Sequence, residues 1–334
     1  MTTIYDIARE TGLSAMTVSR VLNNKSASAK TRVKVERAAR KYGYVLNTRA
    51  ASLKSKKTCA IGVIITDIAN PVSPPGLRTM HDLLKAAGYH LILGITYGKA
   101  EEQIEVLQMM RRERVAGLLL GTCEEEEHPD CDELIGEMIR SGVPVVLTGR
   151  NRGGLNADQV TLDNVSGAWK ATDYLLRTGR KRGAFIAGQK KVLAAQQRLE
   201  GYKKALIAHK LEIDDRLISF GEWTRASGRA QMEKILKSAV PCDAIFAGND
   251  LLALGAMEAL TAAGLEIPKN MAVAGFDDIE LASLVRPRLT TIALPQEKVA
   301  SAACGLLLDR ISGKEKGEPK EILFEPELIV RETA

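Results

Sequence analysis

The stretch from residue 4 to residue 23 most constrains what this chain can form, because it predicts two short helices joined by a sharp turn. Ile4, Ile7 and Ala8 recur at helical spacing and give the first helix an apolar face. Gly12 stands at the predicted turn, where glycine adopts a positive φ without steric penalty. The stretch therefore predicts a compact helical unit, with a helical hairpin on the surface of a larger domain as the alternative.

The second predicted helix begins after Ser14, a residue type whose hydroxyl often caps a helix N-terminus. Val18, Val21 and Leu22 fall on the face of this helix that turns towards a small core. A third helical pattern covers residues 30–42 and adds further apolar side chains to that core, namely Val33, Val35, Ala38 and Ala39. The polar side chains of the second helix remain outside, as in a helix that enters the major groove of DNA.

Charge is distributed unevenly along the chain. Residues 1–57 hold thirteen Lys and Arg against three acidic residues, a formal charge of +10. Because the whole chain carries +6, residues 58–334 carry −4. A basic run alone is more often a solvated face, but beside a helix–turn–helix pattern it favours a domain that neutralises nucleic-acid phosphates.

One ordered set of residues runs through the first 53 positions, namely Ala8, Gly12, Ser14, the run from Thr17 to Asn23, Tyr44, Asn47, Ala50 and Leu53. This set resembles the DNA-binding signature of the lactose-repressor/galactose-repressor (LacI/GalR) family of bacterial transcription regulators, and the resemblance continues across almost the whole remaining chain. It implies a sequence-specific DNA-binding transcriptional regulator, a repressor, whose operator affinity is set by a small effector. It also implies a homodimer on a pseudo-palindromic double-stranded operator, where protein symmetry matches DNA symmetry.

The resemblance assigns roles to the outer side chains of the second helix. Those that correspond to base readers are Ala15, Met16 and Arg20, and those that correspond to phosphate contacts are Thr17, Ser19 and Asn23. Arg20 can pair with a guanine through two hydrogen bonds, whereas phosphate contacts set the register of the helix on the DNA. The full set of predicted DNA-binding residues is Ser14, Ala15, Met16, Thr17, Ser19, Arg20, Asn23, Asn47, Ala50 and Leu53.

Residues 47–57 form a basic segment without Pro or Gly, which would otherwise be taken for a linker. The resemblance implies a hinge helix that DNA orders and that lies in the minor groove, with Leu53 as a wedge between base steps. Leu46 departs from the family, which usually has Pro at that position. The expected domains are therefore a helix-turn-helix headpiece at 1–46, the hinge at 47–57 and a body at 58–334.

The body alternates short apolar runs with helical patterns, a rhythm typical of a parallel sheet covered on both faces. The predicted strands are 60–66, 90–95, 115–120, 143–148, 183–187, 217–220, 244–247 and 271–275, and the predicted helices are 75–87, 100–112, 131–141, 197–209, 227–238, 251–263 and 296–312. The rhythm restarts after Leu162. The body is thus an α/β unit of two Rossmann-like lobes, and the resemblance makes it like a periplasmic binding protein.

Three crossings are expected to join the lobes of this effector-binding and dimerisation body. Lobe 1 is expected at about 58–160 plus 293–320, and lobe 2 at about 161–292 plus 321–334. In such sheets ligands bind beyond the carboxyl ends of the strands, so a cleft between the lobes is the predicted effector site. Hinged lobes can close on a ligand and so reorient the DNA-binding heads.

The predicted effector-binding residues are Ser73, Arg150, Arg198, Trp223, Asn249 and Asp277, of which the last four match the family's usual effector-contacting positions. Such side chains suit the hydroxyls and rings of sugars, and two arginines can also hold the carboxylate of a sugar acid. Structural roles compete with these assignments, because Trp223 can be a core aromatic and Asp163 and Asp250 can be helix N-caps.

Several function classes lack support in the sequence. Five scattered cysteines form no Cys-x-x-Cys pair, so neither a zinc site nor a disulfide framework is expected, and no metal or cofactor is predicted. No phosphate-binding glycine loop or nucleophile elbow occurs, which disfavours an enzyme. A periplasmic solute-binding protein is the alternative, but no signal peptide or membrane span is found, so a cytoplasmic, nucleoid-associated bacterial protein is expected.

Overall fold

The computed structural model describes residues 2–22, 26–44, 58–121, 128–149 and 154–334. The chain divides into two compact units, Met1–Thr58 and Cys59–Ala334. The expected hinge at 47–57 lies outside the described residues. Within the described ranges, no helix combines the length and apolar character needed to cross a membrane.

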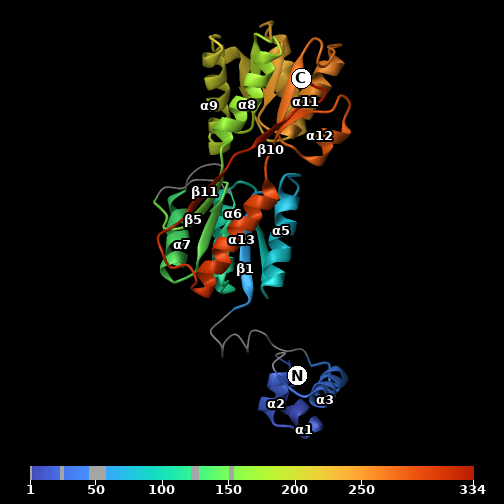
Figure 1. Ribbon diagram of the computed structural model, residues 1–334, viewed down its shortest axis with the longest axis vertical. Helices are drawn as coiled ribbons and strands as arrows, with labels where there is room; N and C mark the ends of the chain where they lie inside the picture. The colour runs from blue at the N-terminus through green and yellow to red at the C-terminus, as the bar shows by residue number, and fades with distance from the viewer. Residues whose placement is uncertain (1, 23–25, 45–57, 122–127, 150–153) are drawn as a thin grey trace. The chain divides into compact units, whose positions relative to one another are not determined.

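The first unit contains the helices α1 (Ile4–Thr11), α2 (Ala15–Leu22) and α3 (Ala29–Lys41), drawn in blue in Figure 1. Gly12 has φ 62° and ψ 24°, so it ends α1 in the left-handed conformation expected of it. The Ser14 hydroxyl accepts a hydrogen bond from the Thr17 backbone N–H at 3.1 Å, which confirms the predicted cap. The Ser28 hydroxyl caps α3 in the same way, at 3.2 Å from the Thr31 nitrogen.

The core of this unit is formed by five buried side chains from all three helices, namely Ile7, Val18, Val21, Val35 and Ala38. Leu22 is half-buried and packs against them, as its helical position predicts. The prediction for Val33 is wrong, since its side chain is 65% exposed. Val33 lies two positions from buried Val35, and residues two apart on a helix point to different sides.

Lobe 1 of the second unit is built on a six-stranded parallel sheet in the order β11-β5-β4-β3-β1-β2. Its strands are β1 (Ala60–Ile65), β2 (His90–Ile95), β3 (Gly117–Leu120), β4 (Val145–Thr148), β5 (Asp158–Leu162) and β11 (Glu321–Phe324). Helices α5 (Ser73–Ala86) and α13 (Gln296–Ser312) cover one face, and α6 (Ala100–Arg112) and α7 (Pro129–Arg140) cover the other. The continuous apolar run of β1 follows from this burial, because Ile61 faces one helical layer and Ile64 faces the other.

Lobe 2 repeats this plan with the sheet order β12-β10-β9-β8-β6-β7, in which β12 alone pairs antiparallel. Its strands are β6 (Gly183–Ala187), β7 (Ile218–Phe220), β8 (Ala244–Ala247), β9 (Ala272–Asp277), β10 (Thr290–Ala293) and β12 (Glu327–Ile329). Helices α8 (Asn164–Arg177) and α9 (Leu193–Ala208) cover one face, α10 (Arg225–Lys237) and α11 (Asp250–Ala262) the other, and a 3-10 turn (Asp215–Leu217) and α12 (Glu280–Leu284) complete the lobe.

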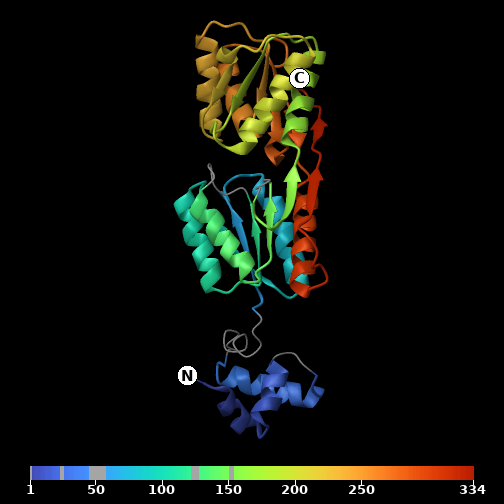
Figure 2. The ribbon, with the colours of Figure 1, turned by 90° about the vertical axis from the view of Figure 1, so that its left-hand side faces the viewer.

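Three segments cross between the lobes, from β5 into α8, from β10 into α13 and from β11 into β12, as Figure 2 shows. The number of crossings agrees with the expectation, and two of the approximate lobe boundaries shift by a few residues. β5 belongs to lobe 1 up to Leu162, and residues 321–324 also belong to lobe 1, because β11 pairs with β5 in parallel. Ile322 and Phe324 hold β11 there by packing into the lobe 1 core.

Helix α8 has no counterpart among the predicted helices, although its cap was anticipated. The Asp163 carboxylate accepts a hydrogen bond from the Ser166 backbone N–H at 2.8 Å and begins the helix. Gly167, Ala168 and Ala171 are buried where α8 packs against β9 and α9. These small side chains weaken the apolar periodicity that would otherwise have revealed the helix.

Candidate DNA-binding surface and effector pocket

Helix α2 presents polar side chains on the side opposite its buried valines. Val18 and Val21 are buried in the core of the first unit, whereas Met16 is 74% exposed and Arg20 is exposed. Ser14 is exposed and the remaining predicted contacts Ala15, Thr17 and Ser19 are partly exposed. Asn23, Asn47, Ala50 and Leu53 lie outside the described residues. The surface of α2 is therefore available, and its polar groups can meet bases and phosphates.

The orientation of α1 against α3 is held by a small polar cluster. The Lys41 ammonium lies 2.7 Å from one carboxylate oxygen of Glu10, and the Tyr42 hydroxyl donates to the other at 2.8 Å. The hydrogen bond from Lys41, followed by that from Tyr42, lowers the pKa of Glu10 below its ordinary value. Tyr5 on α1 is 69% exposed.

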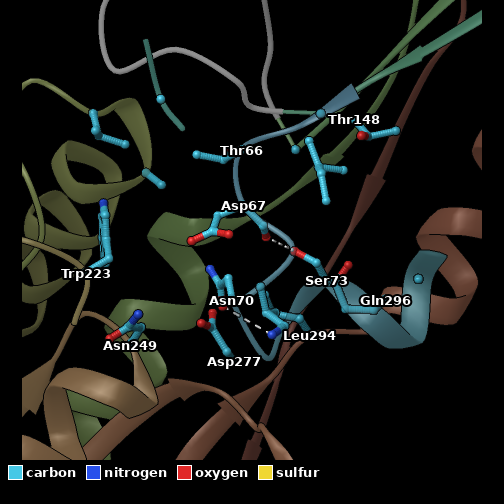
Figure 3. A pocket seen from close by; sticks show the side chains of 18 of the residues that line it. Thr66, Asp67, Asn70, Ser73, Thr148, Trp223, Asn249, Asp277, Leu294 and Gln296 are labelled. Atoms are coloured by element: carbon cyan, nitrogen blue, oxygen red, sulfur yellow. Dashed lines mark hydrogen bonds between the residues drawn. The ribbon is translucent and has the colours of Figure 1, made fainter. Parts of the chain in front are cut away.

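A pocket of about 610 Å³ lies between the two lobes of the second unit. Its walls are the carboxyl ends of strands from both sheets, which is the predicted location. Figure 3 shows that Asp67, Asn70 and Ser73 from lobe 1 line the same pocket as Trp223, Asn249 and Asp277 from lobe 2. Ser73, Arg198, Trp223, Asn249 and Asp277 thus all line the pocket, whereas Arg150 lies outside the described residues.

Arg198 is the most tightly held side chain of the pocket. Its Nε donates to the side-chain oxygen of Asn164 at 3.1 Å, its Nη1 donates to the carbonyl of Gly248, and Nη1 lies 3.6 Å from Oδ1 of Asp277. The guanidinium also lies over the ring of Phe276, 3.7 Å from its centroid. Burial lowers the pKa of Arg198, with Asp277 and Asp250 opposing that shift, and the side chain stays charged.

Asp277 ends β9 with φ 112°, a backbone conformation that residues other than glycine rarely adopt. Burial raises the pKa of Asp277 to about 6, and the positive charge of Arg198 opposes the shift. Strain and a perturbed carboxyl at the same residue are features that concentrate at functional sites.

Asn249 and Asp250 have roles that differ from the predicted ones. The helix N-cap is Asn249, whose side-chain oxygen accepts from the Leu252 backbone N–H at 2.8 Å, so the assignment of Asp250 as N-cap was wrong. Asp250 is fully buried and accepts from the Thr291 hydroxyl at 2.5 Å and from the Ile279 N–H at 2.8 Å. Burial, followed by the nearby charge of Asp277, raises its pKa well above its ordinary value.

Trp223 is half-buried at the pocket wall and packs against the backbone. A Cβ atom added to Gly188 would lie 2.1 Å from the Trp223 ring, so the ring depends on the absence of a side chain there. The guanidinium of Arg198 lies 5.6 Å from the ring centroid. Both predictions for Trp223 are therefore partly correct, since its side chain packs against the core of lobe 2 and also lines the pocket.

Other polar lining residues were missed from the sequence, most clearly Asn164, Gln189 and Glu222. Gln189 follows β6 and Glu222 follows β7, so the rule that ligands lie beyond strand ends would have found both if applied to every strand. Nothing local in the sequence marks Asn164, which lines the pocket and accepts a hydrogen bond from Arg198. Among the described residues, no three His, Cys, Asp or Glu side chains gather in a group that could hold a metal.

Comparison with known proteins places both units in one family. A model of the lacI family of bacterial regulatory proteins matches residues 3–47, and a model of a periplasmic binding protein-like domain matches residues 172–334. The HTH-type transcriptional regulator CelR of Thermobifida fusca is 33% identical over 340 residues, which cover 99% of this chain and 98% of CelR.

Solved structures agree with these matches over the whole length. A complex of the transcriptional regulator CelR with cellobiose has a TM-score of 0.76 at 31% identity and covers 100% of both chains. A lac repressor dimer bound to operator and the anti-inducer ONPF has a TM-score of 0.87 at 27% identity, covering 99% of this chain and 98% of the repressor. The helical unit, the two-lobed body and their order along the sequence are all shared, and the chain belongs to the lacI family of bacterial regulatory proteins.

Proposed function

We propose that this chain is a repressor that binds a double-stranded, pseudo-palindromic operator and responds to a small effector. The observation that carries the proposal is that one chain combines an exposed recognition helix with an interlobe pocket of about 610 Å³. In this proposal the α2 residues Ala15, Met16 and Arg20 read bases, Thr17 and Ser19 contact phosphates, and Ser14 contacts DNA at the start of the helix. Asn23 and the hinge residues Asn47, Ala50 and Leu53 complete the DNA contacts.

The proposed effector is a carbohydrate. Arg198, Asn249 and Asp277 offer donors and acceptors in the density that sugar hydroxyls require, and Trp223 offers an aromatic surface for a sugar ring. Ser73 adds a hydroxyl from lobe 1 at the first turn of α5. The relative CelR is described in complex with cellobiose, a disaccharide, which supports a sugar here.

Effector binding acts on DNA binding through movement of the lobes. The three crossings are the natural hinges, so a ligand that contacts both lobes favours the closed arrangement of the body. We assign the headpiece to residues 1–46, the hinge to 47–57 and effector binding and homodimerisation to 58–334. The lac repressor relative is described as a dimer on its operator, which supports two headpieces per operator here.

Catalysis and solute transport are the alternatives, and neither is favoured. The relatives are named as transcriptional regulators. Residues 3–47 match the lacI family model, and a DNA-binding headpiece of this kind has no role in a solute-binding protein. We therefore propose a protein without catalytic activity that works in the bacterial cytoplasm at the nucleoid.

The recognition role of α2 is tested by Arg20→Ala. We expect this variant to lose about 1–3 kcal/mol of specific operator binding, roughly a 5–150-fold change, because a lost bidentate contact with a base is worth that much. Sequence-specific affinity is measured by fluorescence anisotropy with a selected operator and a scrambled duplex. Effector binding by the body is expected to stay unchanged.

The matched control is Arg40→Ala on α3, which removes the same charge from an 84% exposed side chain. This control is expected to weaken operator and scrambled DNA equally, since it affects only general electrostatic attraction. Equal operator preference in Arg20→Ala and the unaltered protein would contradict the recognition role of Arg20.

The pKa of Asp277, raised to about 6, predicts a pH dependence of effector binding. Sugar hydroxyls donate to the ionised carboxylate, so binding must displace the proton that Asp277 holds below about pH 6. Effector affinity is expected to fall roughly tenfold per pH unit below that value and to level off above it. Without effector, the raised pKa contributes stability at low pH that is lost as pH rises through about 6.

Isothermal titration with a binding sugar between pH 5 and 8, in two buffers of different ionisation enthalpy, measures both affinity and proton release. Arg198 and Asp250 are the other titratable groups that interact with this carboxyl. Affinity that stays constant across this range would show that the effector does not bind the Asp277 carboxylate.

A further inference from the structure

The charges on the described pocket wall are unbalanced. Among the described lining residues there is one basic side chain, Arg198, and there are three carboxylates, Asp67, Glu222 and Asp277. Arg198 and Asp277 form a buried ion pair at 3.6 Å, with side chains 9% and 8% exposed. This pair has no net charge, so the charges that remain among the described lining residues are those of Asp67 and Glu222.

The cation of Arg198 is already committed to the protein. Nε bonds to Asn164, Nη1 bonds to the carbonyl of Gly248 and faces Asp277, and the ring of Phe276 covers the guanidinium plane. A ligand carboxylate would have to compete with Asp277 for this charge and bring a second anion close to the first. Like charges at short range inside a partly desolvated site repel strongly.

Asp67 and Glu222 are held by neutral donors rather than by cations. Oδ1 of Asp67 accepts from the Ala69 backbone N–H at 2.8 Å, and Oε2 of Glu222 accepts from the Gln189 side-chain amide. No ion pair involves either carboxylate within the described parts of the chain. The two carboxylates come from opposite walls, since Asp67 follows β1 and Glu222 follows β7.

A ligand between the lobes consequently meets, from each lobe, one carboxylate that forms no ion pair with any described residue. The hydroxyls of an uncharged sugar can donate to these carboxylates, and charge-assisted hydrogen bonds of this kind are strong. A carboxylate or phosphate on the ligand would be repelled from both walls. Rejection of a competitor by unfavourable charge is a recognised way to achieve specificity.

We propose that Asp67 and Glu222 make this pocket selective for uncharged sugars over their carboxylate and phosphate derivatives. The proposal deepens and rests on the proposed carbohydrate effector. Of the two classes that the sequence left open, it favours the uncharged sugar over the sugar acid.

The test is a set of matched ligands titrated calorimetrically into the full-length protein at pH 7.5 and low ionic strength. The probes are glucose with glucosamine, glucuronate and glucose 6-phosphate, and cellobiose with cellobionate. We expect the protein to bind each anionic sugar at least tenfold more weakly than its uncharged parent. We expect no such loss of affinity for the cationic glucosamine. The tenfold gap is expected to narrow as salt is raised, because screening weakens the repulsion.

Charge-removing variants locate the source of the selectivity. Asp67→Asn and Glu222→Gln are each expected to reduce the affinity ratio between uncharged and anionic sugar by threefold or more. The ratio is the readout because both residues line the pocket, so absolute affinities will change as well. The matched control is Glu200→Gln on α9, a 53% exposed carboxylate of the same lobe, which is expected to leave the ratio unchanged.

Separate outcomes contradict the two levels of the proposal. Tighter binding of an anionic sugar than of its parent, particularly a preference that Arg150→Ala removes, overturns the charge selectivity and leaves the carbohydrate effector standing. An unchanged ratio in both Asp67→Asn and Glu222→Gln also overturns it. Absence of binding by every sugar, with operator binding intact, contradicts the carbohydrate effector itself, and the selectivity for uncharged sugars falls with it.

Discussion

Replacing Arg198 by alanine is expected to remove the effector response while operator binding persists. Arg198 donates to Asn164 and Gly248 and balances the charge of Asp277, so it organises three parts of the pocket at once. Hydrogen bonds to charged groups contribute about 1.5–3 kcal/mol each. Asp277 is a proposed acceptor for the effector, and Arg198 balances its charge. Displacing one such contact therefore predicts an affinity at least roughly tenfold weaker, and displacing two predicts several hundredfold.

A second effect strengthens this expectation. Without the guanidinium, the carboxyl of Asp277 is buried with no positive partner, so its pKa, already raised to about 6, rises further. At neutral pH the carboxyl then becomes partly protonated, and sugar hydroxyls lose a charged acceptor. Arg198→Lys keeps a positive charge but cannot reproduce the planar fork, so we expect it to restore the ionisation of Asp277 more than the effector affinity.

The measurement combines effector titration with operator binding in the presence and absence of effector. The matched control is Arg216→Ala, which removes an arginine of the same lobe that is 71% exposed and paired with Asp214. Operator binding of Arg216→Ala is expected to respond to effector as in the unaltered protein. An Arg198→Ala variant that still responds at the same effector concentration would show that the pocket is not the regulatory site.

The helical unit was well predicted because its determinants are local. Gly12 in a left-handed turn and Ser14 as a cap both follow from the chemistry of one residue and its neighbours in sequence. The misassigned Val33 shows the limit, because hydrophobicity alone does not say which side of α3 packs against the core. The side is decided by tertiary contacts of Val35 and Ala38.

The pocket was predicted by its place in the fold more than by its residues. The parallel-sheet rhythm put Ser73, Trp223, Asn249 and Asp277 at strand or helix ends, and the fold brings them to one cavity. The pairing of β11 with β5 and the true role of Asp250 were missed, because both depend on contacts distant in sequence. Such contacts leave no periodic signal along the chain.

Replacing Asp158 by alanine is expected to destabilise the body by about 3–5 kcal/mol, as found when one partner of a buried ion pair is removed. Asp158 begins β5, its side chain is 1% exposed, and both oxygens accept from Arg310 of α13, at 2.8 and 2.7 Å. Oδ1 also accepts from the Lys320 backbone N–H at 2.8 Å, just before β11. One carboxylate therefore joins β5 and the start of the edge strand β11 to the helix that covers them.

The hydrogen bonds of Arg310 offset the cost of burying this ion pair. Beyond its two bonds to Asp158, it donates to the carbonyls of Gly317 at 2.6 Å and Glu318 at 2.9 Å, so most of its donors are satisfied. Asp158→Ala leaves this cation poorly balanced and frees the 317–320 turn that leads into β11. Asp158→Asn keeps the shape but loses the charge, so a smaller loss is expected from it.

Urea unfolding followed by circular dichroism measures the loss for the whole body, and tryptophan fluorescence follows lobe 2, since Trp169 and Trp223 are the only tryptophans of the chain. The control is Glu233→Ala, which breaks an exposed pair with Arg229 and is expected to cost at most about 1 kcal/mol. A shift in both signals would mean that the lobes unfold together, as three crossings and β11 at the edge of lobe 1 imply. A loss of less than about 1 kcal/mol in Asp158→Ala would instead show that packing of Ile322 and Phe324 suffices to hold β11 in place.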